Sequence, residues 1–148
     1  MGSTLTNLLY HIVFTTKDRR DLVGSEFAPE LYSYIGGIIR ALGGTLLGGN
    51  GPEDHIHLAA ILPPTRTIAD VLRDVKSNSS GWIRDEFPSL SGFGWQDGYS
   101  AFSVSQSVMP KVVEYIRDQK QHHKKMTFEE EIGRLLKQHG IDFDPRYV

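Results

Sequence analysis

The chain has no cysteine among its 148 residues, which excludes disulfide bonds, thiolate metal ligands and a cysteine nucleophile. No apolar run approaches the length of a membrane span, and the N-terminus does not resemble a signal peptide. We therefore expect a cytoplasmic protein without a membrane segment. Strong charge is also missing, because the net charge is only −2. Any binding of nucleic acid must then depend on local basic patches.

The composition is that of a folded protein, with 39% hydrophobic and 23% charged residues. A chain of this length can bury a substantial core. Neither an internal repeat nor a linker interrupts it. These features predict a single domain over residues 1–148.

Apolar periodicity predicts the order of secondary structure. Strands are expected over 8–15, 45–49, 54–62 and 99–105. Helices are expected over 26–42, over 108–125 and over 127–138. A further helix is expected to begin at 67 and to end before a loop over 87–98. This order is the βαββαβ unit of a ferredoxin-like α+β domain. We expect an antiparallel sheet with helices on one face, followed by C-terminal helices.

Two histidines begin the third predicted strand. Side chains alternate between the faces of a strand, so His55 and His57 point to one side, while Ile56 and Leu58 point to the other. Two neutral imidazoles on one face are a common start to a metal site. The alternative is a pair of half-exposed histidines at a strand end, which such a short pattern produces by chance.

A second pair lies on the predicted helix over 108–125. Tyr115 and Gln119 are four residues apart and therefore share a face of that helix. Taken alone, such a tyrosine is more often a packing residue, and such a glutamine a surface residue.

Together these motifs resemble the single-tyrosine HUH transposases of insertion sequences, including their relatives associated with repetitive extragenic palindromes. The resemblance covers nearly the whole chain. It is carried by residues 54–58 (DHIHL), 115–119 (YIRDQ) and 122–125 (HHKK), with support from 11–17, 76–82, 95–99 and 128–131.

The resemblance implies a chemistry and a set of partners. Tyr115 would attack single-stranded DNA at the ends of the element and form a 5′-phosphotyrosine, which a 3′-OH later rejoins. His55, His57 and Gln119 would hold a divalent ion, Mg²⁺ or Mn²⁺. The DNA would carry subterminal hairpins, and the protein would be a homodimer in which either protomer can supply the tyrosine helix. The basic candidates for DNA contacts are Lys17, Arg19, Arg20, Lys76, Lys124 and Lys125.

Three other functions stay open on the sequence. A domesticated relative would bind or nick hairpin DNA without mobilising an element. A metal-dependent hydrolase would use the histidines without covalent chemistry. A ferredoxin-like RNA-binding module would need aromatic residues exposed on its central strands, whereas Tyr10, Phe14 and Phe102 are expected in the core.

Overall fold

The computed structural model describes residues 2–147, without the side chain of Tyr147. Four strands form one antiparallel sheet in the order β2-β3-β1-β4. This confirms the expected ferredoxin-like arrangement. The strands are β1 (Leu8–Thr15), β2 (Thr45–Asn50), β3 (His55–Leu62) and β4 (Ser100–Val104), and the helices are α1 (Ala28–Ala41), α2 (Ile68–Glu86), α3 (Met109–Arg117), α4 (Gln119–His122) and α5 (Phe128–Gln138).

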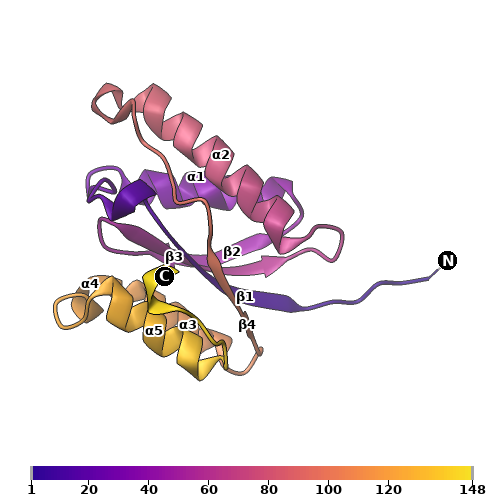
Figure 1. Cartoon of the computed structure of the whole chain (residues 1–148). Helices are drawn as coiled ribbons and strands as arrows, with labels where there is room; N and C mark the ends of the chain where they lie inside the picture. Colours follow the sequence, from indigo (N-terminus) through magenta and orange to yellow (C-terminus); the bar gives the residue numbers. More distant parts are fainter. Residues whose placement is uncertain (1, 148) are drawn as a thin grey trace.

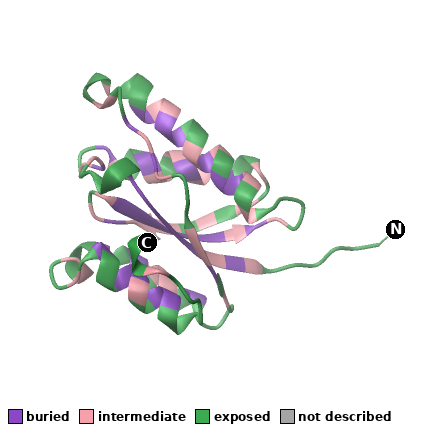
Figure 2. Ribbon diagram, in the orientation of Figure 1, coloured by how far each residue is buried: buried purple, intermediate pink, exposed green. Residues whose placement is uncertain are grey.

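Helices cover both faces of the sheet. The helices of the βαββαβ unit, α1 and α2, lie together on one face, as expected, and the C-terminal helices α3, α4 and α5 lie on the other (Figure 1). Buried residues line the sheet-facing side of both helical layers (Figure 2). No helix within residues 2–147 combines the length and the apolarity needed to cross a membrane.

Strand alternation separates two kinds of buried side chain. Ile12 and Phe14 of β1 join the core beneath α1 and α2, as do Ile56 and Leu58 of β3. The residues between them, including His55 and His57, point to the face covered by the C-terminal helices. Both imidazoles are fully buried, so the alternative of half-exposed histidines is wrong.

The predicted helix over 108–125 is interrupted. Helix α3 ends at Arg117, and α4 occupies only Gln119–His122, because Asp118 leaves the helical region at φ −94° and ψ 18°. Single-helix periodicity does not reveal such a break. After it the chain turns back, and α5 begins behind Thr127, whose hydroxyl accepts a hydrogen bond from the Glu130 N–H at 3.2 Å. This return places the first turn of α5 against the two histidines of β3.

Candidate active site

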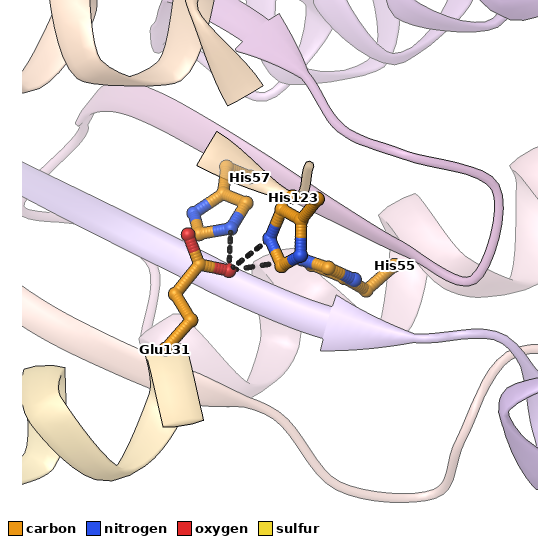
Figure 3. Close-up of side chains that lie close together, drawn as sticks. All are labelled: His55, His57, His123 and Glu131. Atoms are coloured by element: carbon orange, nitrogen blue, oxygen red, sulfur yellow. Dashed lines mark hydrogen bonds and ion pairs between the residues drawn. The ribbon is translucent and has the colours of Figure 1, made fainter. Parts of the chain in front are cut away.

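Three imidazoles meet one carboxylate oxygen between the sheet and the C-terminal helices. The Nε2 atoms of His55 and His57 lie 3.0 Å from Glu131 Oε1, and His123 Nε2 lies 2.8 Å from the same atom (Figure 3). The residues come from β3, from the turn after α4 and from α5. One ligand atom from each of the four lies within 4.8 Å of all the others, which is the spacing of a metal site.

The other oxygen of Glu131 faces the tyrosine. Tyr115 donates its hydroxyl hydrogen to Glu131 Oε2, and the Gln119 side-chain amide donates to the same oxygen at 2.9 Å. The structure therefore brings together four side chains that the sequence singled out, although Tyr115 and Gln119 lie on either side of the helix break. Glu131 connects the tyrosine to the imidazole cluster.

Each strand histidine also has a hydrogen-bond partner at its other ring nitrogen, Nδ1. His55 Nδ1 donates to Asp54 Oδ1 at 2.7 Å, and His57 Nδ1 lies 2.8 Å from His11 Nε2. His57 must donate through Nε2 to reach Glu131, so in its neutral form Nδ1 accepts from the His11 N–H. Such partners fix the orientation of a metal-binding imidazole.

Burial and hydrogen bonding set the charges of this cluster. Burial alone would raise the pKa of the Glu131 carboxyl, but hydrogen bonds from His123, His55 and His57 hold that pKa far below its usual range. Burial, and then the charge of His57, lower the pKa of His11 to about 3, so His11 is neutral at pH 7. His55 faces carboxylates on both sides; burial opposes its charging, but the hydrogen bonds to Asp54 and Glu131 raise its pKa.

The phenol of Tyr115 is kept protonated in this arrangement. Burial raises its pKa above the ordinary value of 10, and the Glu131 carboxylate raises the pKa further. Gln119 and the positive charge of Arg134 act in the opposite direction. Ionisation of the phenol therefore needs additional positive charge near Glu131.

The residues present fit a divalent cation. Three imidazole nitrogens and a carboxylate oxygen converge, and such a donor set binds divalent metals once the Nε2 hydrogens leave. The amide oxygen of Gln119 is buried without a hydrogen-bond partner in the part of the chain described. A buried acceptor in that state is costly, and a cation beside Glu131 could satisfy it.

Sequence reasoning missed His11, Asp54, His123 and Glu131 as members of this site. Period-two alternation could have found His11, because on β1 it lies between Leu9 and Val13 and diagonally across from His57. His123 and Glu131 lie in segments that carry the resemblance, 122–125 and 128–131, but no local pattern assigns either of them to the site. They reach it only because the chain turns between α4 and α5.

The predicted basic residues are divided between the two faces. Arg19 forms an ion pair with Glu129, and Lys124 and Lys125 line a cavity beside His123. Lys76 lies on α2, away from this site, and its ammonium group donates to the carbonyl oxygens of Gln96, Asp97 and Gly98 at 2.9, 3.2 and 2.5 Å. These bonds assign Lys76 a role in holding the loop before β4.

Residues 4–119 match the family model described as "Transposase IS200 like". The chain is 28% identical over 133 residues to the transposase for insertion sequence element IS200 of Salmonella typhimurium, with 84% of each chain covered. It is 25% identical over 117 residues to the ISDra2 transposase TnpA of Deinococcus radiodurans, a match that covers 76% of this chain and 84% of that protein.

Two solved structures share the fold. A crystal structure from Deinococcus radiodurans R1, assigned as a transposase, superposes with a TM-score of 0.66 at 25% identity and covers 80% of this chain and 95% of that one. A tyrosine transposase bound to a REP hairpin superposes with a TM-score of 0.62 at 14% identity and covers 83% and 72% of the two chains. The second likeness concerns the fold alone.

Proposed function

Because the chain belongs to the IS200-like transposase family, we propose that it cleaves and rejoins single-stranded DNA through a covalent bond between Tyr115 and the DNA. One observation carries this proposal: the Tyr115 hydroxyl and the imidazole cluster share the carboxylate of Glu131. A hydrolase would activate water and would not need a phenol there. An RNA-binding module would not need the cluster at all.

The metal role extends beyond the ligands expected from the sequence. His55, His57 and Gln119 would hold Mg²⁺ or Mn²⁺ together with His123 and Glu131. A divalent cation bound there would polarise the oxygens of the scissile phosphate. Three imidazoles are a poor environment for Mg²⁺, which prefers oxygen ligands, so we expect tighter binding of Mn²⁺.

Tyr115 would act as the nucleophile. Its oxygen attacks the scissile phosphorus and its proton passes to water, a loss that a cation bound beside Glu131 would favour, while Glu131 Oε2 accepts the hydrogen bond that orients the hydroxyl before the attack. The new bond joins phosphorus to the tyrosine oxygen, and the bond to the 3′ oxygen breaks. That oxygen takes up a proton from water and leaves as a 3′-OH, so a later 3′-OH can reverse the step.

Covalent trapping tests the reaction. A labelled hairpin with randomised single-stranded flanks is incubated with protein and Mn²⁺, and adducts that survive denaturant are isolated and sequenced at the cleaved position. We expect adducts with the wild type, none with Tyr115→Phe and none in EDTA. Adducts that persist in Tyr115→Phe would move the nucleophile to another residue, and full cleavage in EDTA would contradict the metal role.

The partner and assembly predictions need their own measurements. Single-stranded DNA with a subterminal hairpin remains the proposed substrate, and a homodimer the proposed assembly. Mixed dimers of His57→Ala and Tyr115→Phe recover cleavage only if the tyrosine serves the partner's site. The ring centroids of Tyr115 and His57 lie 5.9 Å apart. An inactive mixture shown to contain heterodimers would assign the tyrosine to its own chain.

A domesticated function would show itself differently. Such a relative would form the same adducts on hairpin DNA, but the gene would lack matching palindromes at its flanks. Sequencing those flanks therefore separates a mobile element from a domesticated one.

A further inference from the structure

A cavity of about 430 Å³ reaches the site from the side of Tyr115 and His11. Its walls come from the end of β4, from α3 and from α5. Apolar side chains form much of the lining, and two cations belong to it, Lys111 and Arg134. Within the part of the chain described, no carboxylate lines this cavity.

The cavity on the other side of the site differs in charge. It has a volume of about 700 Å³ and reaches the site at Asp54 and His123. Three cations line it, Arg19, Lys124 and Lys125, and Arg19 is already paired with Glu129. The carboxylates outnumber the cations: Asp18, Asp21, Glu53, Asp54, Glu129 and Glu130. A phosphodiester chain is repelled there and attracted to the cavity beside Tyr115.

Both cations of the smaller cavity lie on the same helices as active-site residues. Lys111 lies one turn before Tyr115 on α3, and Arg134 follows Glu131 by three residues on α5, so each shares a helix face with an active-site residue. Neither forms an ion pair among residues 2–147. The positive charge of Arg134 lowers the pKa of the Tyr115 phenol, which agrees with the position of Arg134 in the same cavity.

We propose that this cavity binds one of the two nucleotides joined by the scissile phosphate. The unpaired base lies against the apolar side chains of Val104, Val108 and Leu135, and Lys111 and Arg134 bind backbone phosphates. The proposal rests on the proposed function and adds to it the strand-binding subsite beside the nucleophile. Apolar walls with cations are suited to single-stranded DNA, whose bases are free to leave the stack.

The base-binding half of the proposal is tested by filling the cavity. Val108 lines the cavity and is 47% exposed, so Val108→Trp can occupy it without disturbing the core. The matched control is Leu47→Trp on β2, where the side chain is 38% exposed and lies outside the cavity. Each variant is assayed for adduct formation on the cleaved oligonucleotide and on versions abasic at either nucleotide flanking the cleaved bond.

We expect the rate losses caused by Val108→Trp and by the abasic position to be non-additive. In the wild type and in Leu47→Trp, one abasic position should lower the rate of adduct formation at least about tenfold, as expected when a base loses its stacking surface. Val108→Trp should lower the rate on intact DNA to a similar degree and be indifferent to the abasic change, because the base is already excluded. The proposal would be overturned if the two rate losses multiply when Val108→Trp acts on abasic DNA, or if neither abasic position lowers the rate of the wild type.

The phosphate-binding half is tested by removing charge. Lys111→Gln and Arg134→Gln are compared with Lys137→Gln, which makes the same charge change on α5 but does not line the cavity. Binding to a hairpin with and without its single-stranded flank is measured over a range of salt in the Tyr115→Phe background. Each cavity variant should reduce the slope of log affinity against log salt by about 0.7, and only when the flank is present.

These outcomes distinguish the two proposals. Variants at Lys111, Arg134 and Val108 that behave like their controls, while the wild type forms adducts, overturn the subsite and leave the transposase chemistry intact. A folded wild type that binds Mn²⁺ but forms no adduct on any single-stranded library overturns both.

Discussion

Both faces of the sheet are covered by helices, but their buried side chains differ in chemistry. Beneath α1 and α2 the strands contribute Ile12, Phe14 and Ile56, which form an apolar core. Beneath the C-terminal helices the same strands contribute His11, His55 and His57, all at most 3% exposed. Burial of apolar surface stabilises the fold, whereas burial of these imidazoles is tolerable only because each has a polar partner. The face beneath α1 and α2 is therefore an apolar core, whereas the other face combines smaller apolar clusters, which include Phe102 and Met109, with the imidazoles of the candidate site.

Removing a large side chain from the apolar face should give the largest change in stability. Phe14 is fully buried and packs edge-to-face on Trp95 with ring centroids 5.0 Å apart. We expect Phe14→Ala to lower the free energy of unfolding by about 3–5 kcal/mol because it leaves a cavity. Urea denaturation followed by circular dichroism measures this. The metal-free and metal-loaded proteins should lose the same amount, and a loss confined to the loaded protein would contradict the separation of the faces.

The next effect should appear in metal affinity. His11 contacts His57 but none of the other three members of the cluster through a hydrogen bond in the described structure. His11→Phe keeps a ring in place and removes the hydrogen bond that orients His57, so the affinity for Mn²⁺ should fall about 10–100-fold. Isothermal titration calorimetry measures the affinity. His139→Phe is the control, because His139 stacks on Phe102 and makes no hydrogen bond to the cluster in the described structure; equal losses in both variants would contradict an orienting role for His11.

Local signals in the sequence were sufficient for most of the fold. Strand periodicity placed β1 and β3, and the helix starts expected at 67 and 127 agree with α2 and α5, which begin behind the caps Thr67 and Thr127. The break at Asp118 was missed because no glycine or proline marks it, and residues 117–125 contain no residue that strongly disfavours a helix. Its cause is the path of the chain back to the sheet, and no residue-level propensity records that path.

The candidate site also contains residues that the sequence could indicate and residues that it could not. The side chains of His55, His57, Tyr115 and Gln119 could be grouped because each pair lies within one element and the resemblance joined the pairs. Glu131 could not be found this way, since its contacts with His55 and His57 span more than 70 residues of sequence. A glutamate in the first turn of a helix is ordinarily a favourable surface residue, and only the tertiary fold buries this one.

The two helix caps offer a matched comparison of the faces at smaller scale. Thr67 caps α2 on the apolar side and Thr127 caps α5 on the site side, with hydrogen bonds of 3.1 and 3.2 Å. Replacing either with alanine should lower the free energy of unfolding by about 1 kcal/mol. Only Thr127→Ala should also weaken Mn²⁺ binding, by a few fold, because α5 carries Glu131. Equal Mn²⁺ affinities in the two variants would show that the cap does not influence the position of Glu131.

The smallest effect is expected at the orphaned hydroxyl of the apolar face. Tyr32 of α1 buries its OH without a hydrogen-bond partner among the residues described. Burial raises the pKa of its phenol well above 10. An unsatisfied buried hydroxyl is a cost to the folded state, so Tyr32→Phe should leave the free energy of unfolding within about 0.5 kcal/mol of wild type at pH 7 or raise it slightly.

The pH dependence of stability tests whether the Tyr32 hydroxyl is buried and unsatisfied. Since the folded-state pKa of Tyr32 is raised, the unfolded chain loses this proton first, and the wild type loses stability as the pH rises above about 10. Tyr32→Phe lacks that contribution, so its advantage over the wild type should grow between pH 9 and roughly 11 in urea denaturation, while adduct formation at pH 7 stays unchanged. A constant difference across this range would mean that folding does not raise the pKa of the Tyr32 phenol.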